Sequence, residues 1–191
     1  YQCERTPDTG MPPFAFRLHQ FISRGDTVFA TIAPPEQRYS TGRGQRFRPG
    51  SDQQQVLLPL AFCRECGQEY ATVRLVQDAP DQPRRVVPRD VTDQARDDTG
   101  EIGVLYISTA APWPTDPEAQ VERLPEDWLE EHRGSLRVRR DHRQKLPQPL
   151  VLGADGVEDA QGVACAFLPG PFRFCLCCGV SYNFRQTSDF A

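Results

Sequence analysis

The residues "FCRECG" (62–67) are repeated later in the chain as "FCLCCG" (174–179), and most of what the sequence predicts about the fold follows from this repeat. A Cys-x-x-Cys pair in a tight turn presents two thiolates to one ion, and zinc takes four such ligands in a tetrahedron. The glycine after each pair permits a positive φ, so that the chain turns back and its amides face the sulfurs. We therefore predict one Zn²⁺ ion per chain, held by Cys63, Cys66, Cys175 and Cys178.

Apolar, strand-like runs flank the cysteine pairs. Residues 55–60 lead into the first pair and residues 69–76 leave it, and a similar run leaves the second pair. A strand, a cysteine turn and a second strand form one half of a zinc ribbon, and two facing halves complete the site. We therefore expect ribbon halves at about 55–76 and 171–185, with residues 77–170 as an insertion between them.

The other cysteines and one histidine leave alternatives open. Cys177 lies between the ligands of the second pair, and a Cys-x-Cys arrangement would use it in place of Cys178. His19, in an alternating run, is either an additional ligand or structural. Cys3 and Cys165 fit no ligand pattern, and the apolar neighbours of Cys165 indicate a core position.

The two pairs also admit interpretations without a metal, as buried cysteines or as a redox dithiol. A thioredoxin-like motif occurs once, at a helix start, whereas both pairs here sit between strands. Two pairs in the same sequence context favour a metal site over chance.

The composition indicates one domain, spanning residues 1–191, rather than several. With 26 acidic and 22 basic residues the net charge is -4, which does not favour extended coating of nucleic acid. The sequence has no apolar run of roughly 18 residues and no signal peptide. Seven cysteines without a secretory signal indicate a reducing compartment, so we expect a cytoplasmic protein. Because the chain opens at Tyr1 without Met, we expect it to be a piece of a longer protein.

The periodicity of the rest of the chain predicts mostly strands. With 18 Pro and 14 Gly, long helices should be few, and the expected class is α+β and β-rich. The best helix signal is at 125–132, which begins with Pro and acids and is followed by Gly134. Loops are expected at 34–52 and 77–101. Further strands are expected at 14–18 and 27–32 (as a hairpin), 102–107, 135–140, 149–152, 162–168 and 180–184.

Two basic stretches are candidates for contact with nucleic acid. The first interleaves arginine with aromatic residues, as surfaces that bind single strands do. The alternative for either stretch is a solvated loop, since acidic residues lie nearby. The candidates are Arg38, Tyr39, Arg43, Arg46, Phe47 and Arg48 in the first stretch, and Arg137, Arg139 and Arg140 in the second.

Catalytic motifs are missing from the sequence. No phosphate-binding loop of the Gly-x-x-x-x-Gly-Lys-Ser/Thr type occurs. The histidines follow no triad or metal spacing, and a zinc ion with four cysteine ligands has no position left for water. We therefore expect no enzymatic activity in this segment.

Five stretches along the chain carry a resemblance to a known family: "PFAFRLHQFISRGDTVFAT" (13–31), "LLPLAFCRECGQEY" (57–70), "LPEDWLE" (124–130), "PGPFRFCLCCGVSY" (169–182) and "SDFA" (188–191). With these residues, the chain resembles the cysteine-rich accessory segment in the C-terminal half of large bacterial DEAD/DEAH-box helicases of superfamily two. In such helicases this segment lies beyond the motor domains, holds zinc and supports the path of the nucleic acid. The resemblance implies a parent that binds and hydrolyses ATP, with DNA and its own motor domains as partners of this segment. Cys177 departs from the usual cysteine turn and leaves the fourth ligand open.

Two hypotheses follow from these observations. The first is a structural zinc domain of an ATP-dependent DNA helicase, which positions DNA or packs against the motor. The second is a zinc-ribbon adaptor whose partner is a protein. The motor motifs are absent from this chain, so ATP hydrolysis and unwinding would belong to the rest of the parent.

Overall fold

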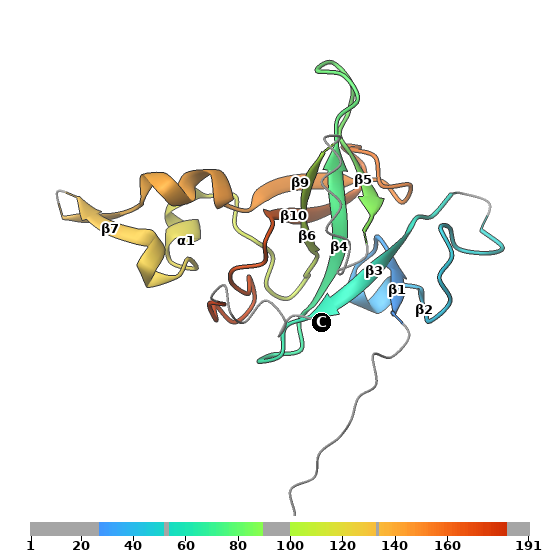
Figure 1. The fold of residues 1–191 in the computed structure, drawn as a ribbon, viewed down its shortest axis with the longest axis horizontal. Coiled ribbons are helices and arrows are strands. Elements are labelled where there is room, and N and C mark those ends of the chain that lie inside the picture. Colours follow the sequence, from blue (N-terminus) through green and yellow to red (C-terminus); the bar gives the residue numbers. More distant parts are fainter. Residues whose placement is uncertain (1–26, 52–53, 90–99, 133, 183–191) are drawn as a thin grey trace, which may run out of the picture.

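An antiparallel sheet forms the body of the protein (Figure 1). The computed structural model describes residues 27–51, 54–89, 100–132 and 134–182. The strand order is β2-β1-β3-β4-β6-β10-β9, and β5 pairs with β4 as well. The predicted β-rich α+β class is thereby confirmed. The strands are β1 (Phe29–Thr31), β2 (Ser40–Thr41), β3 (Leu57–Phe62), β4 (Glu69–Val76), β5 (Arg85–Pro88), β6 (Glu101–Tyr106), β9 (Gln148–Leu152) and β10 (Val163–Pro169).

The loop between β9 and β10 connects one end of the sheet to its middle. It forms hydrogen bonds to β5 and to the residue that precedes β3. The amide of Val86 in β5 donates to the carbonyl of Gly156 (2.8 Å), and the amide of Val56 donates to that of Ala154 (2.9 Å). An ion pair of 2.6 Å between Arg84 and Glu158 joins the same two segments. The sheet therefore curls, and the side chains on its inner side form an apolar core.

Strand alternation explains why β4 is buried on both faces. Ala71, Val73 and Leu75 point into the core enclosed by the sheet. Tyr70 lies in a second apolar cluster on the outer face, together with Tyr106 of β6. This second cluster also contains the first cysteine of each turn, so the outer face of the sheet supports the site described below.

The segment 77–170, expected as an insertion, does not form a separate unit. It supplies β5, β6, β9 and β10 to the sheet that also contains β3 and β4. Residues 85–88 were expected in a long loop, and this expectation is wrong because they pair with β4 as β5. Residues 90–99 of that loop lie outside the described part of the chain.

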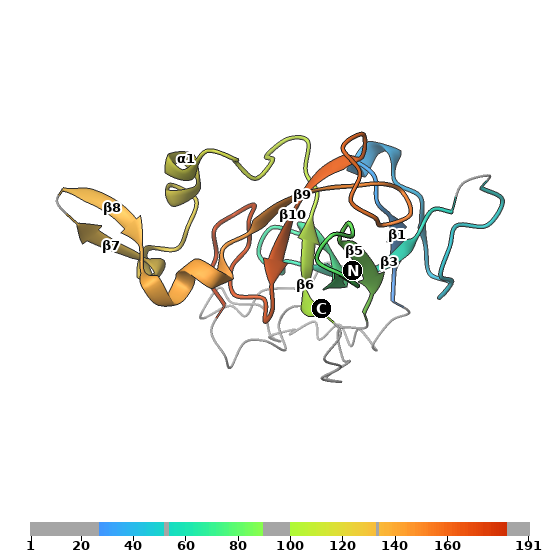
Figure 2. The same cartoon turned by 90° about the horizontal axis from the view of Figure 1, so that it is seen from above.

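A smaller unit between β6 and β9 contains most of the helical turns (Figure 2). The prediction of a helix at 125–132 is wrong. Residues Glu126–Trp128 form a single 3₁₀ turn, and Leu129–His132 are strand β7, which pairs with β8 (Ser135–Val138). The turn-forming Gly134, at φ 79°, closes this hairpin instead of ending a helix.

The short helix α1 (Pro117–Val121) was not predicted, although Asp116 caps it by accepting from the amide of Ala119 at 2.9 Å. It carries the expected start signal, an acidic cap followed by proline. A further 3₁₀ segment covers Arg140–Lys145, and another covers Pro35–Gln37.

Two expected strands fall wholly or partly outside the described residues. The run 14–18 lies outside them, so its hairpin with β1 stays a prediction, and β1 pairs with β2 and β3. After the second cysteine turn, Ser181 makes an isolated bridge to Phe174, and residues 183–184 are not described. Among the described residues, no helix has the length and apolar character needed to cross a membrane.

Candidate metal centre

Four cysteine sulfurs gather where the two repeated turns meet. The Sγ atoms of Cys63, Cys66, Cys175 and Cys178 all lie within 4.8 Å of one another. Between the halves, the distances are 3.9 Å for Cys63 to Cys178 and 3.7 Å for Cys66 to Cys175. A tetrahedron with metal–sulfur bonds of about 2.3 Å has sulfur–sulfur edges of about 3.8 Å. A disulfide would place two sulfurs about 2.0 Å apart, so the spacing fits a tetrahedral metal and not a disulfide.

The two cysteine turns have the same backbone hydrogen bonds. In the first, the amide of Gly67 donates to the carbonyl of Cys63 and the amide of Cys63 donates to that of Gln68, both at 2.8 Å. The glycines Gly67 and Gly179 have φ of 75° and 73°, which allows the chain to turn back after each pair. The matching bonds of the second turn, both 2.9 Å, run from Gly179 to Cys175 and from Cys175 to Val180.

The cluster contains Cys178 and excludes Cys177, whose side chain is exposed. Each turn contributes one buried and one exposed thiol. Cys63 is 1% exposed and Cys175 is 0% exposed, whereas Cys66 and Cys178 face solvent. The tetrad therefore has a protected side against the sheet and an open side toward water.

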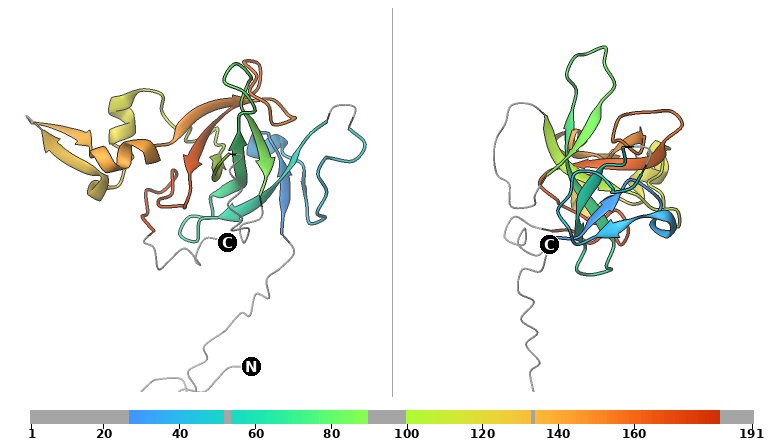
Figure 3. Two further views of the ribbon diagram at one scale, coloured as in Figure 1. Left: turned by 45° about the horizontal axis from the view of Figure 1, so that its top comes forward. Right: turned by 90° about the vertical axis from the view of Figure 1, so that its right-hand side faces the viewer.

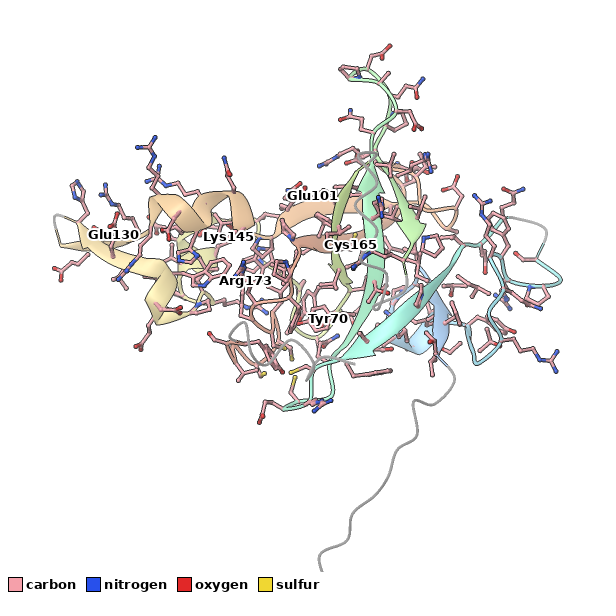
Figure 4. The ribbon with its side chains drawn as sticks, in the orientation of Figure 1. Tyr70, Glu101, Glu130, Lys145, Cys165 and Arg173 are labelled. Carbon is pink, nitrogen blue, oxygen red and sulfur yellow. The ribbon has the colours of Figure 1, made fainter. Side chains whose placement is uncertain are left out.

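Two tyrosines contact the buried sulfurs, and sequence reasoning missed them. The hydroxyl of Tyr70 lies 3.2 Å from the sulfur of Cys175, and that of Tyr182 lies 3.0 Å from the sulfur of Cys63. Figure 4 shows Tyr70 at the end of the sheet that carries the cysteine turns. The signal was present, because the repeat extends to a tyrosine seven positions after the first cysteine in both copies.

The surroundings of the sulfurs shift their pKa values in both directions. Burial acts to raise the pKa of Cys63, but hydrogen bonds from the Tyr182 hydroxyl and from nearby backbone amides lower it to about 7. Burial raises the pKa of Cys175 above its usual value, although the bond with Tyr70 opposes this. Burial also raises the pKa of Cys178. Four such thiols become thiolates together when a cation neutralises their charge, and the donors present therefore fit a bound metal ion.

The unit between β6 and β9 packs behind the second cysteine turn. The buried ring of Phe174 meets Trp128 edge-on at 5.0 Å and Trp113 at 6.2 Å between ring centroids. The guanidinium of Arg123 lies 5.1 Å from the centre of the Trp113 ring and donates to the carbonyl of Leu176 within the turn. These contacts hold the second turn against the sheet.

Comparison with known proteins identifies no family. The chain matches no family model, no curated protein and no solved structure.

The first stretch of nucleic-acid candidates is only partly accessible. The side chain of Arg38 is 6% exposed and pairs with Glu69 at 2.9 Å, so it belongs to the interior and does not face solvent. Arg43 is exposed. Arg46 lies over Phe47 at 5.2 Å, and Arg48 lies over Tyr39 at 4.9 Å.

The second stretch lies on and beside the β7–β8 hairpin. Arg137 pairs with Glu130 at 2.8 Å, and Arg139 donates to the carbonyl of Leu129 at 2.9 Å, while Arg140 is exposed. Figure 1 places this hairpin and the loop after β2 at opposite ends of the molecule, so the two stretches do not form one surface.

The other candidates lie elsewhere. Cys165 is half-buried and donates to the carbonyl of Leu150 at 3.5 Å, and burial and the charge of Glu158 raise its pKa to about 12. The side chain packs against the core without being fully buried, so the expected core position is confirmed only in part. His142 stacks on Trp128 at 4.6 Å and is not part of the sulfur cluster. His19 and Cys3 lie outside the described residues, so a role for His19 as an additional ligand stays a prediction.

Proposed function

We propose that this chain is a structural zinc domain without catalytic activity of its own. The observation that carries the proposal is the sulfur tetrad, in which Cys66 and Cys175 stand 3.7 Å apart across 109 positions of sequence. One ion bound there joins two distant parts of the chain, so its binding free energy contributes to folding. Thiolates that must stay reduced suit a reducing compartment, which supports a cytoplasmic location.

Zinc is the metal that we propose, and iron is the alternative that the same ligands admit. Both metals accept four thiolates in a tetrahedron. Elemental analysis of protein purified without added metal should give about one zinc per chain. Bound iron would give the protein strong visible absorption. Bound zinc has a filled d shell and leaves the protein colourless. A metal-free folded protein would contradict the proposal.

A structural role is favoured over a catalytic one by the ligand count. A catalytic zinc keeps a position open for water or substrate. Four protein sulfurs at the observed spacing fill all four positions of a tetrahedral ion. Two of these sulfurs are also buried against the sheet, which suits a site that holds the fold together.

We further propose that the parent protein is an ATP-dependent DNA helicase and that this domain supports its DNA or packs on its motor domains. The support is the resemblance to helicase accessory segments together with the exposed arginines of the loop after β2. Arg46 and Arg48 lie over aromatic rings, an arrangement that also suits stacking with bases. The direct test is the parent gene, where helicase motor motifs upstream of this segment are expected. Their absence would remove the helicase from the proposal and leave the zinc domain intact.

The second candidate function is that of an adaptor for a protein partner. It is favoured by the β7–β8 hairpin, which stands away from the sheet in Figure 3. Leu136 on this hairpin is 60% exposed, an unusual position for a large apolar side chain. In a helicase parent, the same hairpin would be the part of the domain that reaches toward the motor domains.

A further inference from the structure

Two tyrosines contact the buried cysteine sulfurs in a crossed arrangement, and the proposed structural role of the metal does not account for these contacts. Tyr70 belongs to the first half of the site and contacts Cys175 of the second half. Tyr182 belongs to the second half and contacts Cys63 of the first. Each tyrosine stands at the same place in its own turn and reaches the first cysteine of the other turn. The two halves are therefore related by an approximate twofold arrangement in which each holds the other.

The direction of the hydrogen bonds follows from the atoms involved. A metal-bound thiolate carries no proton and can only accept. The oxygen of Tyr70 already accepts a hydrogen bond from the amide of Leu176 at 2.7 Å, which leaves its own proton for the sulfur of Cys175. The amide, the hydroxyl and the sulfur thus form a chain in which each hydrogen bond strengthens the next.

The surroundings make these bonds strong. Tyr70 and Cys175 are both 0% exposed, and Cys63 is 1% exposed. The ring of Phe172 lies between the tyrosines, 5.0 Å from Tyr70 and 5.2 Å from Tyr182 between centroids, and limits access of water. Hydrogen bonds to an anionic acceptor in such an environment are about twice as strong as neutral ones.

We propose that Tyr70 and Tyr182 are positioning residues of the metal centre, which donate to the buried sulfurs and slow the release of the metal. This inference rests on the proposed metal site. The hydroxyls withdraw charge from Cys63 and Cys175, so these two sulfurs react with competing electrophiles less readily. The sulfurs of Cys66 and Cys178 belong to exposed residues. Metal exchange therefore begins at the exposed pair and is completed only when the two crossed contacts break.

The test compares metal release from the wild-type protein with release from Tyr70→Phe, Tyr182→Phe and the double variant. Phenylalanine keeps the ring and removes only the hydroxyl. With a chromophoric chelator in excess, the double variant should lose zinc on the order of 10-fold faster or more, as loss of partners around metal ligands typically causes. Tyr106→Phe is the control, because its buried hydroxyl donates to the carbonyl of Ala111 at 2.6 Å and its ring lies 5.7 Å from that of Tyr70.

A second readout distinguishes the hydrogen bonds from packing. With Co²⁺ in place of zinc, the sulfur-to-metal charge-transfer band should move to longer wavelength in each tyrosine variant, because a sulfur without its donor is more easily oxidised. The Tyr106→Phe control should show the wild-type band. Tyr182 is only half-buried, so Tyr182→Phe should fold even if Tyr70→Phe does not.

The possible outcomes separate this inference from the proposed function. Unchanged release rates and an unchanged band in Tyr182→Phe, with one metal per chain, would overturn the role of the tyrosines and leave the metal site standing. A wild-type protein that binds neither zinc nor cobalt would overturn the metal site itself.

Discussion

The sulfur of Cys66 lies 3.7 Å from the sulfur of Cys175, although 109 positions of sequence separate the two residues. Between them the chain builds β4, β5, β6, β9 and β10 of the sheet. The contact therefore closes a long loop around most of the fold. Closing such a loop costs chain entropy, and a metal ion that bridges its ends offsets that cost in the folded state.

Loss of one ligand should destabilise the whole domain. Cys66→Ser or Cys175→Ser removes a sulfur and with it the tight binding of the metal. We expect the melting temperature to fall by at least about 10 °C, since each kcal/mol lost shifts it by about 2–4 °C at this size. Cys165→Ser is the control outside the cluster and should cause a smaller shift. Equal shifts for all three would mean that the cysteines act only through packing.

The ion pair between Arg84 and Glu158 should stabilise the closed sheet in a pH-dependent way. The hydrogen bonds from Arg84 lower the pKa of Glu158. A carboxyl group with a lowered pKa stabilises the fold above its unfolded pKa, and this contribution disappears as the pH falls through the folded value. Both side chains are about a third exposed, so Glu158→Gln should cost roughly 1 kcal/mol or less at pH 7.

The difference between Glu158→Gln and the wild type should shrink as the pH falls below about 4.5, the ordinary value for a glutamate. Urea unfolding at several pH values measures it. Asp78→Asn, which removes the exposed partner of Arg85 at 3.0 Å, is the matched control and should change little at any pH. A difference for Glu158→Gln that stays constant across this range would show that the ion pair does not act through its charge.

The aromatic contacts behind the second cysteine turn should be essential for stability. Trp128 is 3% exposed and packs against Phe174 and His142. Trp128→Ala should lower the free energy of unfolding by about 3–5 kcal/mol because a large cavity remains. Leu136→Ala on the neighbouring hairpin should change it by less than about 0.5 kcal/mol because that side chain is exposed. If the two variants unfold at the same denaturant concentration, this packing does not support the turn.

The loop after β2 should contact DNA if the helicase proposal holds. A variant of the parent with Arg43, Arg46 and Arg48 changed to Ala should bind single-stranded DNA more weakly and with a shallower salt dependence, since fewer phosphates are neutralised. The isolated domain should bind DNA only weakly, on the order of micromolar or poorer at physiological salt. Arg38 stays unchanged in this variant, because it pairs with Glu69 inside the fold and its replacement should impair stability. Unchanged DNA affinity in the triple variant would identify the loop as solvated surface.

The sequence predicted the parts of the fold that depend on local patterns. The strand β4 (Glu69–Val76) was predicted with its observed bounds because its run of apolar and β-branched residues is distinctive. The four clustered cysteines were predicted as well, because Cys-x-x-Cys-Gly specifies a turn with its own hydrogen bonds.

Other parts could not be predicted because distant contacts decide them. Residues 129–132 carry helix-forming acids but pair with β8, and Trp128 is fixed by Phe174 from far along the chain. The curl of the sheet depends on the hydrogen bond between Val86 and Gly156, and no local sequence pattern predicts this bond. Tyr70 and Tyr182 differ from these cases, because the sequence repeat includes both residues. Their cysteine partners could not be predicted from the repeat, since each contact joins the two halves of the site.

We propose that one metal ion joins the two cysteine turns through four sulfurs. X-ray absorption at the zinc edge of the purified protein tests this most directly. We predict a shell of four sulfur atoms at about 2.3 Å from the zinc, with no nitrogen or oxygen in the first shell. In Cys178→Ser, the sulfur count should fall to three, whereas Cys177→Ser should keep four. A folded protein without metal, with Cys63 joined to Cys66 by a disulfide, would contradict the account.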